Sequence, residues 1–195
     1  MTDDKGGTDI QASRKQITPA EYFSKHEQAC SPAVLFCSKF RTMRDAWMSD
    51  DVKIQWMLWA VGRLRYPDRG IIDFVNGCLD VTRTHADTAR RAADERDYLQ
   101  AYKNAVHWSN FCLNEMRNCV AKIEYSLRYP ALPCHARIDA SEHAYVVSEA
   151  AITCAYVVYG AGDNGFDGAA HIARISECKR QRDHLRKLFK DMFIE

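Results

Sequence analysis

The sequence predicts an all-α protein, organised as a single-domain bundle of six or seven helices. The chain has only 9 Gly and 5 Pro among its 195 residues, about 7% against a usual level near 12%. So few turn residues argue against a many-stranded sandwich or barrel. Apolar residues recur with a helical period through most of the chain, and the alternation typical of a strand is nowhere sustained. With 47% hydrophobic residues, the chain can fill a sizeable core.

The overall charge excludes some classes of partner. The 27 Lys and Arg residues are balanced by 26 Asp and Glu residues, which leaves a net charge of +1. This balance argues against a domain that as a whole binds nucleic acid or membranes through its net charge.

Residues 1–16 are polar and lack the apolar core of a signal peptide, and the longest uncharged run, 150–162, is short for a membrane span. We therefore expect a disordered lead over 1–16, a helical domain over 17–195 and a cytoplasmic protein.

Three local patterns predict where the first helices begin. Thr18-Pro19-Ala20-Glu21 has the form of a capping box with proline at the first helical position. Ser31-Pro32 repeats the device, and Ser49-Asp50-Asp51 places carboxylates at the positive end of a third helix. The third helix is rich in tryptophan and should stop before Pro67. The predicted helices are 19–29, 32–47 and the segment that follows Asp51.

Apolar spacing predicts the later helices. Ile71, Phe74, Val75, Cys78 and Leu79 form an i, i+3, i+4, i+7, i+8 series. The polar stretch 80–97 leaves open whether that helix breaks. A long stripe, in which Trp108 is expected to be buried with Trp56 and Trp59 of the preceding helix, predicts a helix over 98–127. Two further helices are expected over 141–159, with Gly160 as its C-terminal cap, and over 168–192, with Ile172, Ile175 and Leu185 among its apolar positions.

The eight cysteines are expected to be reduced core thiols rather than disulfides or metal ligands. Cys30 and Cys37, like Cys112 and Cys119, are seven residues apart. This spacing puts both members on one helical face, about 10 Å apart, which is too far for a disulfide between them. Most of the cysteines also lie in apolar stripes, where they act as small hydrophobic residues.

The basic stretch 179–187 contains the first candidate binding residues. It has five Lys and Arg residues in nine positions, and on a helix these wrap most of the surface. A solvated face, an acidic protein partner and nucleic acid are the three interpretations. Trp47, at the end of a predicted helix, is a candidate exposed anchor. The candidate partner-binding residues are Trp47, Arg180, Arg182 and Arg186.

Four other patterns contain residue types that occur in catalytic or metal sites. The loop 163–168 resembles the start of a calcium loop, but it has Gly165 at the third position and a positive charge at the twelfth. His26-Glu27-Gln28-Ala29-Cys30 resembles a zinc-protease helix without a third ligand, and Cys134-His135 places a thiol beside an imidazole. The alternative function is a helical-bundle enzyme or a metal- or cofactor-binding protein. Its site would use four side chains whose spacing differs from the Glu-x-x-His of di-iron bundles: His107, Glu115, His143 and Glu149. No cofactor or metal is expected, and no catalytic residue is assigned.

The second half of the chain resembles the putative immunity protein family of bacterial toxin loci. The resemblance covers roughly 67–190 and rests on four elements: Pro67-Asp68-Arg69 at the start of an amphipathic helix, His143-Ala144, Ala150-Ala151, and Glu177…Gln181…Leu185 in the last helix. It implies a helical, cytoplasmic protein of bacteria or phage that neutralises another protein, a toxin or a defence-system component, by binding it. The function expected is therefore non-enzymatic inhibition by occlusion.

Overall fold

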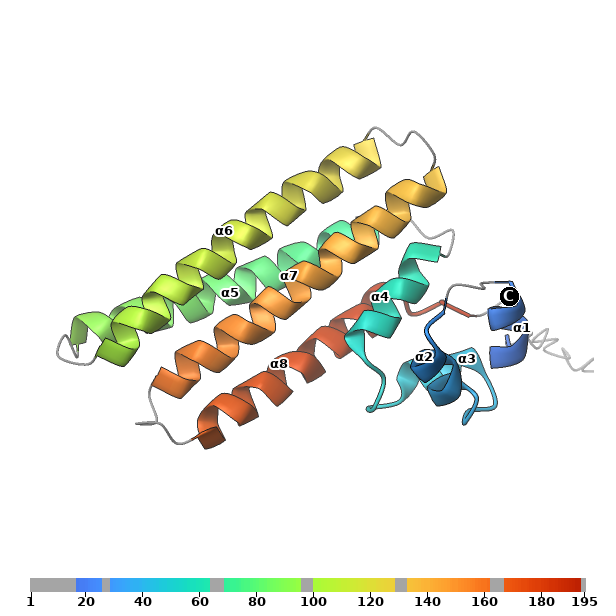
Figure 1. Ribbon diagram of the computed structural model, residues 1–195, viewed down its shortest axis with the longest axis horizontal. Helices are drawn as coiled ribbons and strands as arrows, with labels where there is room; N and C mark the ends of the chain where they lie inside the picture. Colours follow the sequence, from blue (N-terminus) through green and yellow to red (C-terminus); the bar gives the residue numbers. More distant parts are fainter. Residues whose placement is uncertain are drawn as a thin grey trace, which may run out of the picture. The chain divides into compact units, whose positions relative to one another are not determined.

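A computed structural model describes residues 17–25, 29–63, 69–95, 100–128, 133–161 and 167–193. Every regular element in these ranges is a helix and none is a strand, which confirms the predicted all-α class. The chain divides into two compact units, Met1–Ala46 with Asp191–Glu195, and Trp47–Lys190. Figure 1 shows the helices of both units. The predicted disordered lead lies outside the described residues.

The smaller unit contains short helices that are stabilised locally. Helix α1 spans Pro19–Ser24 and α2 spans Ser31–Cys37, and the unit also includes the first part of α3, Met43–Met48. The predicted capping box is confirmed, because the Glu21 amide donates to the Thr18 hydroxyl (3.2 Å) and the Thr18 amide donates to the Glu21 carboxylate (2.9 Å). Near the end of the chain, the ring of Phe193 packs edge-to-face on Tyr22 with 5.4 Å between centroids.

The predicted helix over 32–47 is wrong in one respect, since two helices occupy this segment. Helix α2 ends at Cys37, and α3 begins at Met43 after an irregular turn. Thr42 starts the new helix by accepting a hydrogen bond from the Asp45 amide at 3.1 Å. A hydroxyl at this position satisfies one of the amides that the first turn leaves open. Because of this break, the described residues form eight helices rather than six or seven.

The larger unit is a bundle of long helices around α7. Helix α7 spans Pro133–Ala161 and packs against all four other long helices of this unit (Figure 1). These helices are α4 (Ile54–Arg63), α5 (Arg69–Glu95), α6 (Gln100–Arg128) and α8 (Asp167–Leu188). Where α5, α6 and α7 meet, the buried residues are mostly small, which lets the helices approach closely. This cluster consists of Ala89, Ala105, Cys112, Cys154 and Val158.

Several predicted helix boundaries are corrected by the structure. Helix α5 runs unbroken through 80–95, because Thr82, Ala86 and Ala89 continue its buried stripe. Helix α4 begins only at Ile54, so the carboxylates of 50–51 precede its first turn. Helix α7 continues past Gly160, which is therefore not a cap. A Cβ at Gly160 would lie 3.3 Å from the Ala170 Cβ, so the glycine allows α8 to approach.

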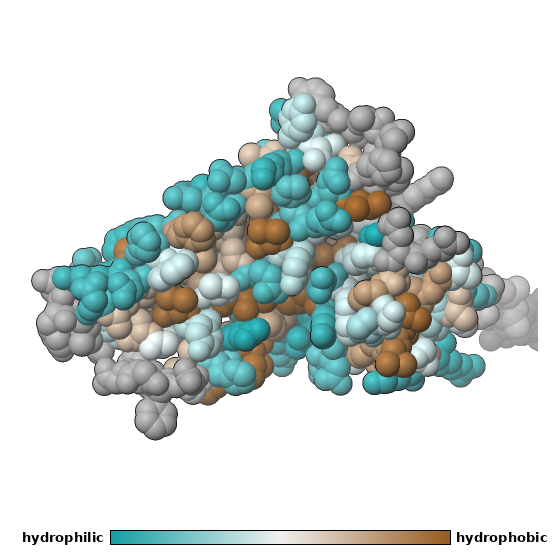
Figure 2. All heavy atoms as spheres, in the orientation of Figure 1, coloured by the Kyte–Doolittle hydropathy of each residue, from teal (hydrophilic) through white to brown (hydrophobic). Residues whose placement is uncertain are grey.

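The surface of the described residues mixes polar and apolar side chains (Figure 2). One segment among these residues, Ile138–Ala161 of α7, is long and apolar enough to cross a membrane by length and composition alone. The same segment packs against four other helices of the bundle. A core helix of this kind is apolar because other helices cover it on several sides. The cytoplasmic location remains a prediction.

Candidate functional site

A buried polar network joins α7 to α8. Glu177 and Gln181 of α8 are 4% and 0% exposed, and Ser148 of α7 is fully buried. The Ser148 hydroxyl donates to the Gln181 side-chain carbonyl (2.5 Å), and the Gln181 amide donates to the Ser148 carbonyl (3.2 Å) and to the Glu177 carboxylate (2.8 Å). Each polar group of Gln181 therefore has a partner. Such complete pairing makes a buried amide tolerable.

Arg180 extends this network toward α5. Its Nε and Nη2 atoms donate to the two oxygens of Glu177 at 2.7 and 2.6 Å, a bidentate pair. Nη2 also lies 3.8 Å from the sulfur of Cys78 on α5. Despite the nearby guanidinium, burial dominates and raises the pKa of Cys78 to about 12. Arg180 thus compensates the buried charge of Glu177, and Cys78 stays a protonated thiol at neutral pH.

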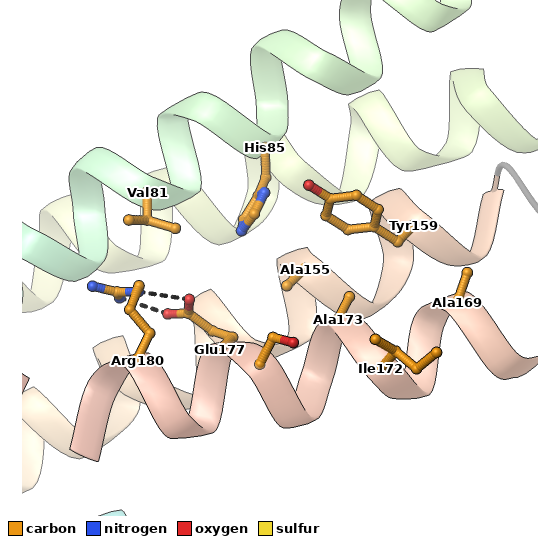
Figure 3. Close-up of a pocket in the computed structure, with 10 residues that line it drawn as sticks. Val81, His85, Ala155, Tyr159, Ala169, Ile172, Ala173, Glu177 and Arg180 are labelled. Carbon is orange, nitrogen blue, oxygen red and sulfur yellow. Dashed lines mark hydrogen bonds and ion pairs between the residues drawn. The ribbon is translucent and has the colours of Figure 1, made fainter. Parts of the chain in front are cut away.

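A cavity of about 590 Å³ opens beside this network between α5, α7 and α8. In Figure 3, Val81 and His85 reach into it from α5, with the Arg180–Glu177 pair at one end and Tyr159 and Ile172 toward the other. The ring of His85 packs edge-to-face on Tyr159, with 5.5 Å between centroids. The Nδ1 atom of His85 is buried and makes no hydrogen bond to the described residues. Burial, opposed by Glu177 and aided by Arg180, lowers the pKa of His85, so the ring is neutral near pH 7.

The apolar positions expected for the last helix are partly wrong. Ile172 and Ile175 are 66% and 54% exposed, whereas Glu177 and Gln181 lie inside. Leu185 is buried as expected. The three residues of the Glu177…Gln181…Leu185 pattern therefore form one buried face of α8. In this chain they act in helix packing.

Of the predicted partner-binding residues, Arg180 and Arg186 are engaged inside the larger unit. Arg186 donates to the backbone carbonyls of Ser49 (2.7 Å) and Trp47 (3.3 Å) and contacts the carboxylate of Asp183 (2.9 Å). It thereby ties the segment before α4 to α8. Two of the five cations in 179–187 thus have internal partners, and the stretch does not form a continuous basic face.

The predicted exposure of Trp47 is wrong. Its side chain is 5% exposed, beside the segment that Arg186 holds. Arg182 is half-buried, and its Nε atom makes no hydrogen bond to the described residues. Neither residue offers the large exposed side chain that an interface anchor needs. Partner binding by these four residues remains a prediction.

A second stripe of α6 faces solvent, which the apolar spacing of this segment does not predict. Seven residues along this side are separated alternately by four and three positions, and all seven are exposed. We call them the outer stripe: Asn104, Trp108, Phe111, Glu115, Asn118, Lys122 and Tyr125. Within it, Trp108 and Phe111 are 49% and 52% exposed and stack edge-to-face at 5.7 Å.

The expectation that Trp108 is buried is therefore wrong. Its neighbours Ala105, Cys112 and Met116 do face the core, so the helix was predicted correctly and only the tryptophan was placed on the wrong side. Trp56 and Trp59 are half-buried, each beneath a cation. Lys53 lies 5.0 Å from the Trp56 ring and Arg63 lies 4.1 Å from the Trp59 ring.

The four candidate metal ligands of the alternative enzyme are not brought together as a site. His107, Glu115 and Glu149 are exposed, and the Nδ1 atom of His143 bonds to the Asp139 carbonyl at 2.8 Å. Among the described residues, no group of three or more His, Cys, Asp or Glu side chains could hold a metal ion. The structure therefore gives no geometry for metal chemistry by these four residues.

The described cysteines are free thiols, and most are buried as predicted. Cys37, Cys78, Cys112, Cys119 and Cys154 are buried, whereas Cys178 is half-buried and Cys30 is exposed. Burial raises the pKa of Cys37 and of Cys154 to about 11. Since the thiolate is the reactive form, these core cysteines are poor nucleophiles near neutral pH.

Three short motifs fall wholly or partly outside the described residues. They are the zinc-protease-like segment from His26, the loop from Asp163 and the side chains of Cys134-His135. The backbone of Cys134-His135 belongs to the first turn of α7, so this pair lies in a helix rather than in the expected proline-rich loop.

No family model, no curated protein and no solved structure matches this chain. The resemblance to the immunity protein family remains a prediction.

Proposed function

We propose that this protein is a non-enzymatic binding protein that neutralises a partner protein by occlusion, using the outer stripe of α6. The observation that carries the proposal is the half-exposed pair Trp108 and Phe111 on a rigid helix. Tryptophan and other aromatic residues dominate the energetics of protein interfaces, because they desolvate a large area at little cost in side-chain entropy.

The spacing of the outer stripe favours a helix as the element that binds. Its seven positions repeat every 3.5 residues on average, which is the geometry that lets one helix pack along another. Helix α6 packs on α5 and α7 through another side, where Ala105, Cys112 and Met116 are buried. The outer stripe thus lies on a different side of α6 from these buried residues, and its seven residues are exposed.

Charges on the same stripe would select the partner helix. Glu115 and Lys122 are exposed and lie two turns apart. A matching helix would place a basic residue opposite Glu115 and an acidic residue opposite Lys122. The partner is therefore expected to present an amphipathic helix with apolar residues and this charge order.

The test begins with affinity capture from a lysate of the source organism. The wild-type protein is compared with the double variant Trp108→Ala/Phe111→Ala and with Ile175→Ala, which removes an exposed apolar residue of α8. The captured protein is then purified, and its own activity is measured while the wild-type protein is titrated into it. We expect inhibition that saturates at one equivalent and an affinity that falls at least about 30-fold in the double variant, because loss of a hot spot costs about 2 kcal/mol or more.

Three results would contradict the proposal. The first is capture that the double variant retains, and the second is capture that leaves the activity of the partner intact. The third is a concentration-dependent dimer in sedimentation experiments that Trp108→Ala/Phe111→Ala abolishes. That result would assign the outer stripe to self-association.

A further inference from the structure

The solvent side of α8 has a surface that partner binding by α6 does not use. Ile172 and Ile175 are 66% and 54% exposed and lie one turn apart. The exposed Lys179 and the half-buried Arg182 continue the same line along the helix, because the four positions follow one another at intervals of three, four and three residues. We call these four residues the α8 stripe. Its first half is apolar and its second half is basic.

A cavity opens beside the apolar half of the α8 stripe. Its volume is about 590 Å³, and Ile172 and Tyr159 are exposed side chains that line it (Figure 3). Most of the other lining side chains are apolar, and the Arg180–Glu177 pair at one end is neutral as a unit. An apolar group therefore gains more in this cavity than a charged group, which would lose its hydration without gaining a free counter-ion.

The exposed cations of α8 have no acidic partner among the described residues. Lys179 and Arg174, which lies on the flank of the stripe, are both exposed and make no ion pair with a described carboxylate. The two carboxylate side chains that the structure describes on α8 are already paired with arginines of the same helix: Glu177 with Arg180, and Asp183 with Arg186. The solvent side of α8 therefore has a net positive charge next to its apolar residues.

From these features we infer that the α8 stripe docks an acidic, amphipathic segment of a partner protein, with one apolar side chain of that segment seated in the cavity. The isoleucines and the cavity provide the contact that excludes water, and an anchor side chain in a pocket is typical of the residues that dominate binding energy. Arg174 and Lys179 select carboxylates on the partner. A nucleic acid fits this surface less well, because its phosphates would meet only these few cations and would leave the isoleucines uncovered.

The α8 stripe and the outer stripe of α6 differ in the charges that they select. The outer stripe contains one acidic and one basic residue, Glu115 and Lys122, whereas the α8 stripe contains only cations. A segment whose only charges are carboxylates therefore matches α8 and meets Glu115 unfavourably on α6. This difference allows one probe to distinguish the two surfaces.

The probe is a fluorescein-labelled synthetic helix of about 18 residues, with leucine along one face and glutamate on the others. Its binding to the full chain is measured by fluorescence anisotropy. We expect saturable binding that weakens as NaCl is raised from about 50 to about 300 mM. One control peptide has lysine in place of glutamate and another has glutamine in place of leucine. Each should bind at least about tenfold more weakly than the probe.

Substitution of the apolar residues tests whether the probe lies on α8. Ile172→Ala/Ile175→Ala removes the exposed apolar half of the stripe and should weaken binding at least about tenfold. Ala173→Phe fills the cavity, where Ala173 is a lining residue, and should have a similar effect. The matched control is Trp108→Ala/Phe111→Ala, which removes two exposed apolar residues from α6 and should leave binding unchanged. Far-UV circular dichroism and thermal unfolding show whether each variant is folded.

Reversal of one charge tests the selection of carboxylates. Lys179→Glu should weaken binding about fivefold and reduce its dependence on salt. Arg117→Glu changes the net charge of the protein by the same amount, but on the exposed side of α6. It should leave the affinity within about twofold of wild type, because the two charges lie on different helices.

Four results would overturn the inference. They are no saturable binding of the probe, equal binding of the lysine peptide, undiminished binding in a folded Ile172→Ala/Ile175→Ala variant, and loss of binding in Trp108→Ala/Phe111→Ala, which would place the probe on the outer stripe. A DNA duplex of about 20 base pairs that displaces the probe and depends equally on Lys179 would also overturn it, since the cations would then serve nucleic acid. Failure of inhibition through the outer stripe would leave these results unchanged.

Discussion

Helices α5 and α8 both pack against α7, but α5 buries a mainly apolar face and α8 also buries a carboxylate and an amide. The buried side of α5 contains Phe74, Val75 and Cys78, an apolar face that its sequence pattern predicts. The buried side of α8 contains Glu177 and Gln181, whereas Ile175 of the same helix faces solvent and the exposed Ile172 borders the cavity. One helix therefore follows the amphipathic rule, and the other departs from it over three turns.

The difference shows what burial of a polar helix face requires. Apolar side chains of α5 need only a surface to cover them, whereas Gln181 needs specific acceptors and donors on Ser148 and Glu177. A buried polar group is tolerated where its hydrogen bonds are complete, and its energetic cost appears when one partner is lost. The cavity lies next to this polar network. Departures from the simple pattern are expected at functional sites.

The largest loss of stability is expected when the apolar buried face of α5 is truncated. Phe74→Ala removes a fully buried ring from α5 and should lower the free energy of unfolding by about 3–5 kcal/mol. Ile175→Ala also truncates an apolar residue, but on the exposed side of α8, and should stay within about 0.5 kcal/mol of wild type. Urea unfolding followed by far-UV circular dichroism measures both. Similar losses in the two variants would remove the distinction between the helices.

A somewhat smaller loss is expected when the polar network of α8 is broken. Glu177→Ala leaves the donors of Arg180 and Gln181 without their acceptor and should cost about 2–3 kcal/mol. The estimate is moderated because the Arg180 side chain is about one-third exposed and can reach water. Glu177→Gln keeps the shape and one acceptor, so its loss should be smaller. Denaturant unfolding would contradict this order if the two substitutions were equally harmless.

The smallest effect is expected on the pH dependence of stability. It comes from His85, which lies on the side of α5 that lines the cavity. Burial lowers the pKa of His85 below its usual 6.5, an effect that Glu177 opposes and Arg180 reinforces. The unfolded chain therefore takes up a proton at higher pH than the folded protein, and stability should fall as pH drops through 6.5. One such histidine can contribute a slope of at most about 1.4 kcal/mol per pH unit.

The measurement compares unfolding free energies at about pH 7.5 and about pH 5.5. His184 has a pKa lowered by burial and by the charges of Arg180 and Lys187, with Asp73 opposing. Wild type should therefore lose stability toward acid, and His85→Phe should lose less, with the contribution of His184 remaining. An equal loss in both proteins would show that His85 ionises alike in the folded and unfolded states.

Local signals in the sequence were sufficient for much of the fold. The Thr18 capping box, the apolar series from Ile71 and the long stripe of α6 each depend on residues close in the chain, and the structure contains all three elements. The break before Met43 was also readable, because Thr42 and Asp45 have the spacing of a helix start. Continuity of α5 could be recognised from alanine and threonine at core spacing.

The candidate sites depend on pairings that no local pattern contains. The burial of Gln181 rests on Ser148, 33 residues away, and Arg186 finds its acceptors in Ser49 and Trp47 more than 130 residues away. The apolar spacing of 98–127 predicts a buried Trp108, although the helical angle of this residue fits the outer stripe. The cavity at His85 arises only where three helices meet.

The central structural claim is that α8 turns Glu177 inward, and carboxylate footprinting tests it most directly. The native protein is treated with a carbodiimide and glycine ethyl ester, and modification of each carboxylate is followed by mass spectrometry. Glu177, buried and paired with Arg180, should stay unmodified until the protein unfolds, whereas Asp183 on the exposed side of the same helix should react quickly. Equal rates of modification for Glu177 and Asp183 in the folded protein would contradict the claim.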